Sequence, residues 1–311
     1  MGKIAFVFPG QGAQSVGMAR DAYDTLPDAK ALFDTADRTL GFDLTKLVFD
    51  GPVEELKQTA NTQPALLTAS LALLQAVQAK GIKADYAAGH SLGEYSALAA
   101  AGVLSFEDAV AIVRARGQFM EAAVPGGQGA MAAVLGADRS KLAELCAEIS
   151  AAGTVVEPAN LNCPGQIVVS GSAEGVEALS ARVKEIGAKR AIALEVSGPF
   201  HSSLMKEAAE KLGEKLADVT LGEGILPVVA NVTARPVSGA AAVRESLISQ
   251  VYSPVLWEDS VQWLIGEGVD TFVEIGPGSV LAGLIKKIDK SVQVFSVNSL
   301  EAADGLAEAL A

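Results

Sequence analysis

The sequence predicts an α/β protein in which a large domain with a mostly parallel sheet is interrupted by a small ferredoxin-like subdomain. Two observations predict this fold class. Short apolar runs pass through glycine-containing turns into helical patterns, as in parallel α/β domains. One internal stretch instead follows the order βαββαβ, which is typical of a ferredoxin-like unit. With 311 residues, half of them apolar, the chain can form two domains with buried cores.

The first 125 residues carry the strand–turn–helix pattern. Residues 4–8 form an apolar run that predicts a buried strand, and the turn residues Pro9 to Gly12 end it. Apolar residues at helical spacing predict a helix over 62–80, with Gly81 as its C-cap. Further elements are expected as a strand at 84–89, a helix at 92–101 and a helix from the N-cap Ser105 to about 123.

Residues 126–198 follow the second pattern. Strands are expected at 131–135, 154–162, 166–170 and 190–194, and helices at 140–151 and 173–186. The helical pattern resumes from Ser202, and a further strand is expected at 271–275. We therefore predict a discontinuous large catalytic domain, 1–125 and 199–311, with the small subdomain at 126–198 inserted into it.

Composition excludes several classes of protein. The 24 Lys and Arg against 37 Asp and Glu give a net charge of −13. No run of Lys and Arg is longer than a pair such as Lys286–Lys287, so a nucleic-acid binder is not expected. No apolar run approaches the length of a membrane span, and the N-terminus lacks the apolar region of a signal peptide. Cys146 and Cys163 suit neither a disulfide scaffold nor a metal-ligand pair. We expect a soluble, cytoplasmic protein without a bound metal.

The sharpest motif is Gly89-His90-Ser91-Leu92-Gly93, which matches G-x-S-x-G. A predicted strand precedes it and a predicted helix follows it, as at the nucleophile turn of α/β-hydrolase-like domains. Small flanking residues let the Ser91 hydroxyl stand exposed, and the helix N-terminus offers free N–H groups to a developing oxyanion. The alternative is a glycine-rich turn with an incidental serine.

A serine nucleophile needs a base, and the chain has only two histidines. His90 adjoins Ser91, and neighbouring side chains diverge at a tight turn. His201 is therefore the better candidate, although a loop histidine without a catalytic role is the alternative for it.

Several segments together resemble a known family. They are 8–12 (FPGQG), 63–65 (QPA), 89–97 (GHSLGEYSA), 116–120 (RGQFM), 198–201 (GPFH), 250–251 (QV) and 274–278 (EIGPG). In this order they resemble malonyl-CoA:acyl carrier protein transacylase of type II fatty acid synthesis, to which the acyltransferase domains of polyketide synthases are related. The resemblance spans almost the whole chain.

The resemblance implies a set of catalytic roles. Ser91 would be acylated by malonyl-CoA in a ping-pong mechanism, with His201 as general base and then as acid toward the leaving thiolate. A backbone carbonyl, at Gln250 here, would orient the imidazole. The oxyanion hole would consist of the N–H groups of Gln11 and Leu92.

The resemblance also implies substrate-binding residues. Arg116 would bind the malonyl carboxylate, which a guanidinium matches with two parallel donors, and Met120 lies on the same helix face. Phe200 implies malonyl rather than methylmalonyl selectivity. Gln63 would line the pocket and Asn162 the cleft from the small subdomain. Each of these three residues has an alternative role without substrate contact. Arg116 would be a solvated surface arginine, Gln63 a polar residue at a helix N-terminus, and Asn162 a loop asparagine. Glu94 and Tyr95 we interpret as structural.

The family uses no bound cofactor: malonyl-CoA is a substrate, and the phosphopantetheine is carried by the partner, acyl carrier protein. We expect a monomer. Carrier proteins are acidic, so a chain at −13 should be slow to meet one. We therefore hypothesise a local basic patch drawn from Lys189, Arg190, Lys206, Lys286 and Lys287.

Three other functions are weighed. A nucleotide binder would use the glycine-rich segment 10–15, but Asp34 and Asp37 lie in a helical pattern where an acidic strand end is needed. A serine hydrolase or thioesterase could share the Ser91 turn, but one for neutral acyl groups has no use for a buried Arg116. A catalytically idle carrier-binding module would not need Ser91, His201 and Arg116 together.

Overall fold

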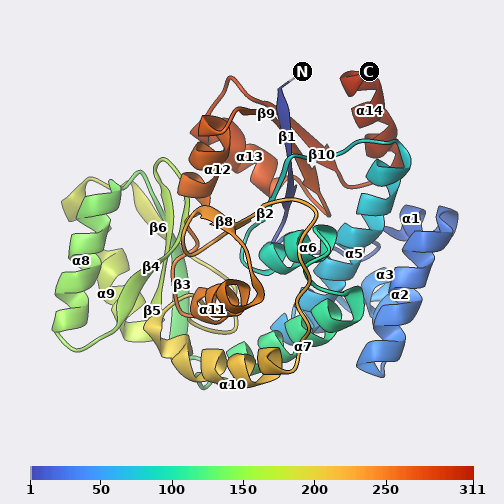
Figure 1. The fold of residues 1–311 in the computed structure, drawn as a ribbon. Coiled ribbons are helices and arrows are strands. Elements are labelled where there is room, and N and C mark those ends of the chain that lie inside the picture. Colours follow the sequence, from blue (N-terminus) through green and yellow to red (C-terminus); the bar gives the residue numbers. More distant parts are fainter. Residues whose placement is uncertain (1) are drawn as a thin grey trace.

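The structure, a computed structural model, describes residues 2–311 as two lobes that each surround one sheet (Figure 1). The large lobe contains a six-stranded sheet in the order β10-β9-β1-β2-β7-β8, and the small lobe a four-stranded sheet in the order β4-β5-β3-β6. The predicted fold class is confirmed.

All neighbouring strands of the large sheet are parallel except β7 and β8. The strands are β1 (Lys3–Phe8), β2 (Tyr86–Gly89), β7 (Val228–Ala230), β8 (Arg235–Val237), β9 (Val269–Ile275) and β10 (Gln293–Val297). Phe8 at the end of β1 is in register with Gly89 at the end of β2. The segments that follow these two strands therefore meet at one edge of the sheet, where α/β proteins place their sites.

Helices cover both faces of this sheet. They are α1 (Arg20–Thr25), α2 (Pro27–Leu40), α3 (Leu44–Asp50), α4 (Val53–Leu56), α5 (Thr59–Ala79), α6 (Leu92–Ala100), α7 (Phe106–Ala122), α10 (Lys206–Ala217), α11 (Ala240–Gln250), α12 (Trp257–Gly266), α13 (Val280–Ile288) and α14 (Leu300–Leu310), with a 3₁₀ turn at Ser203–Met205.

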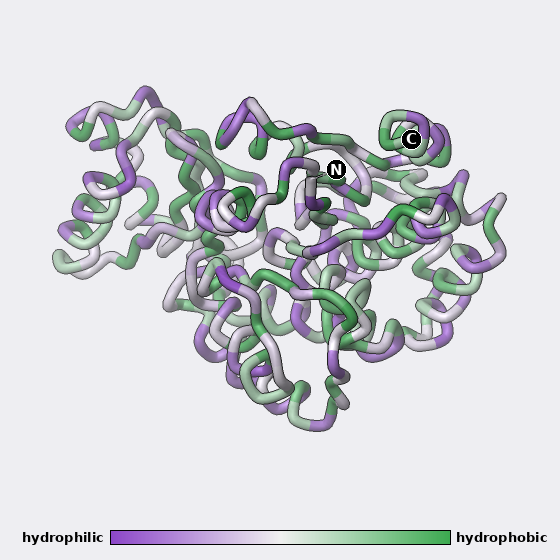
Figure 2. Tube along the Cα trace, turned by 45° about the horizontal axis from the view of Figure 1, so that its top comes forward, coloured by the Kyte–Doolittle hydropathy of each residue, from purple (hydrophilic) through white to green (hydrophobic). Residues whose placement is uncertain are grey.

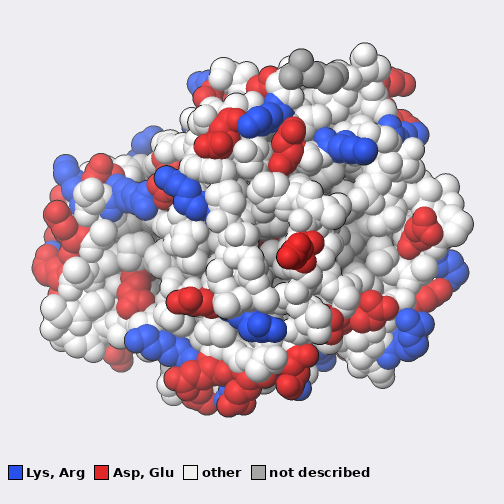
Figure 3. Space-filling view, viewed as in Figure 1, with Lys and Arg blue, Asp and Glu red and all other residues white. Residues whose placement is uncertain are grey.

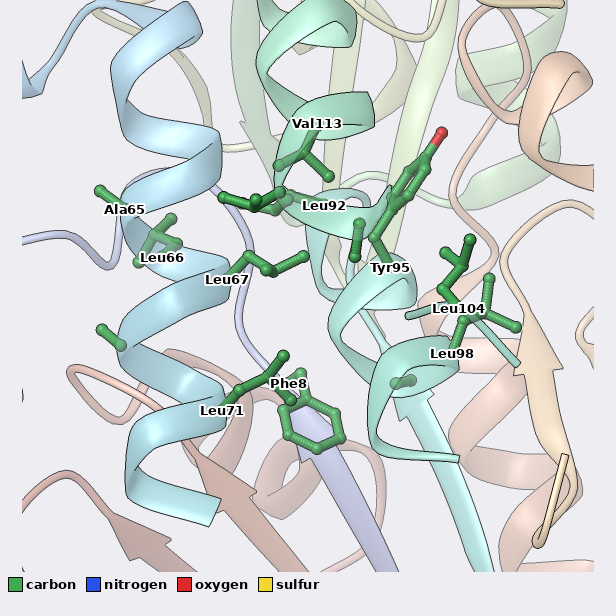
Figure 4. Packing of buried hydrophobic residues seen from close by; sticks show 14 of the residues in the cluster. Phe8, Ala65, Leu66, Leu67, Leu71, Leu92, Tyr95, Leu98, Leu104 and Val113 are labelled. Carbon is green, nitrogen blue, oxygen red and sulfur yellow. The ribbon is translucent and has the colours of Figure 1, made fainter. Parts of the chain in front are cut away.

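The alternation of side chains along β1 divides the core into two layers. Phe6 and Phe8 pack on the side of α5 and α6, whereas Ala5 and Val7 pack on the side of α12 and α13. Figure 4 shows the first layer, in which Phe8 lies between leucines of α5 and the apolar face of α6. The helix that follows Ser91 is thus fixed against the sheet by buried apolar contacts.

The small lobe has the predicted βαββαβ order. Its elements are β3 (Gly129–Leu135), α8 (Arg139–Ala151), β4 (Val156–Cys163), β5 (Gln166–Ser172), α9 (Ala173–Arg182), a 3₁₀ turn (Val183–Ile186) and β6 (Arg190–Ala193). All strand pairs are antiparallel. One face packs on α8 and α9, and the other turns Met131 and Val168 toward the large lobe's core.

The structure differs from the sequence predictions in a few elements. Helix α5 begins at Thr59, three residues before the predicted start, and three strands, β7, β8 and β10, were not expected. β7 and β8 have three residues each, too few for a two-residue alternation to be visible. The lobe boundaries at 125/126 and 198/199 stay a prediction.

Hydrophobic segments run through the interior of both lobes, and the outward turns of the helices are hydrophilic (Figure 2). No helix within residues 2–311 combines the length and hydropathy that crossing a membrane requires.

Candidate active site

Ser91 lies at a strained turn between β2 and α6. Its backbone has φ 52° and ψ −107°, a conformation that residues with a Cβ rarely adopt. The geometry is that of the predicted strand–turn–helix. It places Ser91 at the N-cap of α6.

The glycines of the motif are required by close backbone contacts. A Cβ at Gly89 would overlap the carbonyl of Gly93, and a Cβ at Gly93 would overlap the carbonyl of Phe8. A Cβ at Gly10, after β1, would overlap the carbonyl of His90. These contacts bring the loop after β1 against the turn that carries Ser91.

His201 is the histidine that reaches Ser91. Its Nε2 lies 2.7 Å from Ser91 Oγ, and its Nδ1 lies 2.8 Å from the backbone oxygen of Gln250. A carbonyl oxygen can only accept, so Nδ1 carries the proton and Nε2 is left to accept from the serine hydroxyl. His90 points elsewhere, with its Nε2 at 2.8 Å from Asn162 Oδ1.

Burial keeps the His201 imidazole neutral. The residue is 4 % exposed, and burial, followed by the nearby Arg116 guanidinium, lowers the pKa of His201 to about 3. Its backbone, like that of Ser91, has a positive φ, 59°. A neutral imidazole at physiological pH is the form that can accept a proton.

The Arg116 guanidinium is buried beside Ser91. Nη2 donates to Ser91 Oγ at 3.1 Å and to Gln250 Oε1 at 2.9 Å, and Nη1 donates to Gln63 Oε1 at 2.9 Å. The ring of Tyr95 lies under the group, 5.4 Å from ring centroid to guanidinium carbon. Helix α7 can bring Arg116 this close because Gly117 packs directly on the backbone of α5.

No carboxylate of residues 2–311 forms an ion pair with Arg116. Burial lowers the pKa of Arg116, but a guanidinium remains charged in proteins. A buried cation without an anion is costly. A ligand carboxylate in the adjoining cavity would supply the missing charge.

Two further buried polar residues, Glu94 and Asn231, contact the residues around Ser91. The sequence analysis did not predict either of them as a site residue. Glu94, interpreted above as structural, accepts hydrogen bonds at Oε2 from Gln250 Nε2 at 2.7 Å and from Asn231 N at 2.9 Å. Burial raises the pKa of Glu94 to about 7. Asn231 was missed because it follows β7, a strand that the sequence pattern did not show.

Gln11 and Leu92, whose N–H groups are predicted to form the oxyanion hole, both line the cavity at Ser91. Gln11 follows the Gly10 contact, and Leu92 begins α6. Within residues 2–311 neither N–H donates a hydrogen bond. Both N–H groups are therefore free to donate to a ligand.

A cavity of about 110 Å³ adjoins Ser91. Its lining includes the predicted residues Gln63, Arg116, Met120, Phe200 and His201. A second cleft, of about 270 Å³, shares Gln11 and His90 with the first and includes Asn162. We call this second cleft the outer cleft. The structure thus brings all ten predicted site residues to one region, with Asn162 in the outer cleft rather than in the cavity at Ser91. Among residues 2–311, no group of three or more His, Cys, Asp or Glu side chains could hold a metal ion.

Comparisons with known proteins indicate one family. The sequence profile of the acyl transferase domain matches residues 5–303. The chain is 55% identical over 301 residues to a malonyl CoA-acyl carrier protein transacylase from Bacillus subtilis (strain 168), covering 97% of this chain and 95% of the relative. It is 50% identical over 305 residues to the enzyme of that name from Staphylococcus aureus (strain MRSA252), covering 98% of each.

Solved structures also match almost the whole chain. The malonyl CoA-acyl carrier protein transacylase from Coxiella burnetii superposes with a TM-score of 0.96 at 41% identity, covering 98% of this chain and 97% of that one. A malonyl-transacylase solved in complex with a type II polyketide synthase acyl-carrier protein superposes with a TM-score of 0.95 at 44% identity, covering 99% of each.

A serine on a strained turn, hydrogen-bonded through its hydroxyl to a buried neutral histidine, is typical of enzymes of the acyl-transfer class. The chain belongs to the acyl transferase family, among the malonyl CoA-acyl carrier protein transacylases.

Proposed function

We propose that the protein transfers a malonyl group from malonyl-CoA to the phosphopantetheine thiol of acyl carrier protein, through a malonyl ester of Ser91. The observation that carries the proposal is the contact of Ser91 Oγ with both His201 Nε2, at 2.7 Å, and Arg116 Nη2, at 3.1 Å. The first contact supplies a base. The second places a cation within reach of an acyl group on the same oxygen.

In the first half-reaction, Ser91 Oγ attacks the thioester carbonyl carbon of malonyl-CoA while its proton passes to His201 Nε2. The carbonyl oxygen becomes an oxyanion, which the N–H groups of Gln11 and Leu92 stabilise. The C–S bond then breaks, and His201 returns the proton to the departing CoA sulfur. Malonyl-Ser91 and CoA result.

In the second half-reaction, the thiol of the carrier's phosphopantetheine takes the place of CoA. His201 accepts the thiol proton, the sulfur attacks the ester carbonyl, and the same N–H groups stabilise the second oxyanion. The C–O bond breaks and the proton returns to Ser91 Oγ. The free enzyme is restored.

Arg116 selects the acyl group in this proposal. The malonyl carboxylate pairs with the guanidinium, which is 1 % exposed, and a charge-assisted pair is strong where the charge is buried. Phe200 and Met120 complete the wall and leave a cavity of about 110 Å³. An acetyl group has no charge to offer Arg116.

The carrier protein is proposed to dock where the outer cleft opens. Three of the five predicted basic residues surround the turn between β4 and β5. Lys287 Nζ donates to Gln166 Oε1 at 3.2 Å, Lys189 N donates to Leu135 O at 2.8 Å, and Arg190 pairs with Leu135 in the sheet. Acidic side chains dominate the edge of the molecule over α10, by contrast (Figure 3), which argues against Lys206 as part of this patch.

Charge reversal tests the docking site. We expect Arg190→Glu and Lys287→Glu to raise the KM for holo carrier protein several-fold, because they remove the local attraction for an acidic partner. The rate of acylation by malonyl-CoA should stay unchanged. Lys46→Glu, on the distant helix α3, is the matched control. Unchanged KM values for the carrier in both variants would place the docking surface elsewhere.

The transferase function is tested by following CoA release with and without the holo carrier. We expect one equivalent of CoA per enzyme with malonyl-CoA alone, and continued turnover with stoichiometric malonyl-carrier when the carrier is present. Steady CoA release without the carrier would identify a thioesterase instead.

We also propose that the protein acts as a monomer in the cytoplasm. Both cysteines, Cys146 and Cys163, are buried free thiols, which suits a reducing compartment. Light scattering during gel filtration should give a mass near 31.8 kDa; a mass of twice that value would replace the monomer with a dimer.

A further inference from the structure

The side chain of Asn231 contacts the Ser91 turn from outside the cavity. Asn231 follows β7, and β7 lies beside β2 with Ala88 in register with Val229. Asn231 therefore lies beside the turn, and it is 1 % exposed. It is not among the residues that line the cavity at Ser91, so it does not touch the acyl group.

The Asn231 side chain binds both peptide groups that precede Ser91. Its Oδ1 accepts from Ser91 N at 2.8 Å, and its Nδ2 donates to Gly89 O at 2.6 Å. These two groups lie on either side of His90. The Asn231 side-chain amide thus fixes the backbone conformation from Gly89 to Ser91.

Asn231 is itself held in place. Its backbone N–H donates to Glu94 Oε2 at 2.9 Å, and its backbone oxygen accepts from Leu256 N at 2.9 Å. Glu94 Oε2 also accepts from Gln250 Nε2, which donates in addition to Ser91 O at 3.0 Å. The peptide groups before and after Ser91 are therefore all tied to one buried polar cluster.

The turn needs such support because its backbone is strained. The φ of 52° and ψ of −107° at Ser91 are unfavourable for a residue with a Cβ, and such a conformation persists only when the surrounding contacts hold it. Relaxation would move Oγ relative to His201 Nε2 and move the Leu92 N–H relative to the oxyanion. A displacement of about 1 Å in such a site can cost about a hundredfold in rate.

We propose that Asn231 is a positioning residue for Ser91, which holds the strained turn through its peptide groups and is anchored by Glu94. The inference rests on the proposed role of Ser91. Asn231 acts on the reactivity of the serine and leaves recognition of the acyl group to Arg116.

The test compares Asn231→Ala and Asn231→Asp with wild type. The Ala change removes both hydrogen bonds to the turn. The Asp change keeps the shape but places a carboxylate oxygen against Gly89 O in place of the donor. The matched control is Asn298→Ala: Asn298 follows β10 at the same edge of the sheet, and its Nδ2 donates to Gly278 O at 3.2 Å, away from Ser91.

Acylation is followed by rapid-quench intact mass at varied malonyl-CoA and, separately, acetyl-CoA, with the final acylated fraction used to count folded sites. We expect both Asn231 variants to lose about tenfold or more in the acylation rate constant at saturation, with half-saturation changed by less than about twofold. The loss should be equal for the two substrates, and Asn298→Ala should match wild type.

Two results would overturn the proposal: a saturating rate within about twofold of wild type in either Asn231 variant, or a loss confined to half-saturation. If Asn231→Ala does not fold, Asn231→Asp decides. Failure of the proposed function itself is distinct, because wild type would then form no adduct.

Discussion

His201 Nδ1 lies 2.8 Å from the backbone oxygen of Gln250, so an uncharged carbonyl orients the imidazole. A carbonyl fixes the tautomer but offers no negative charge to an imidazolium. Burial and the Arg116 cation both disfavour the protonated ring. The resting site therefore contains a neutral histidine, which in the proposed mechanism becomes charged only while it carries the Ser91 proton.

This charge state predicts a pH dependence of stability. The pKa of His201 is lowered to about 3 in the folded protein. Between about pH 6.5 and 3, the imidazole is therefore protonated in the unfolded chain but neutral in the folded protein. Stability is thus lost as pH falls from about 6.5 toward 3, by about 1 kcal/mol per pH unit from this group. Urea unfolding of wild type and His201→Gln between pH 4 and 7 should show the steeper loss in wild type. Parallel pH curves would contradict a neutral, buried His201.

Glu94 predicts a dependence of opposite sign. Its pKa is raised to about 7, so between about pH 4.5 and 7 the folded protein holds a proton that the unfolded chain has released. The stability of wild type should fall relative to Glu94→Gln as pH rises through this window, by about 1 kcal/mol per pH unit. The same urea series measures it. A gap between the two proteins that does not change with pH would mean that Glu94 is not shifted.

Arg116→Ala should remove the preference for malonyl-CoA. Truncating one partner of a buried charge pair costs about 2–5 kcal/mol, so kcat/KM for malonyl-CoA should fall at least about thirtyfold while that for acetyl-CoA changes much less. The control on the same helix is Arg114→Ala, because Arg114 bonds to Asn61 and does not line the cavity. An equal fall in kcat/KM for both substrates would show that Arg116 stabilises the site but does not bind the malonyl carboxylate.

Gly93→Ala should destabilise the protein, because its Cβ would overlap the carbonyl of Phe8 and force the turn away from β1. We expect a loss of about 1–3 kcal/mol together with a loss of acylation. Gly283→Ala, in α13 with open space at its Cβ, should instead gain about 0.5–1 kcal/mol from helix propensity. Thermal unfolding distinguishes the two. A Gly93→Ala protein as stable as wild type would show that the turn can accommodate a Cβ at this position.

The parts of the site that were predictable are local in sequence. Gly89 to Gly93 carry the turn within five positions, and a chain with two histidines leaves few candidates for a base. The remaining predicted positions, such as Gln250, depended on a family resemblance rather than on spacing.

The parts that were not predictable depend on long-range packing. Asn231 lies 140 positions from Ser91 in the chain, and the strand that delivers it, β7, has three residues. Glu94 follows the motif, but only the fold shows that its carboxylate meets Gln250 and Asn231. The positive φ of His201 likewise could not be predicted from the sequence, because the position is not occupied by glycine or asparagine, the residues that most often adopt it.

The most direct test of the account is intact mass after brief mixing with malonyl-CoA, in wild type and Ser91→Ala, before and after holo carrier protein is added. We expect a single malonyl adduct on wild type, none on Ser91→Ala, and its disappearance as the carrier gains the same mass. An adduct that persists in Ser91→Ala, or one that never reaches the carrier, would contradict transfer through Ser91.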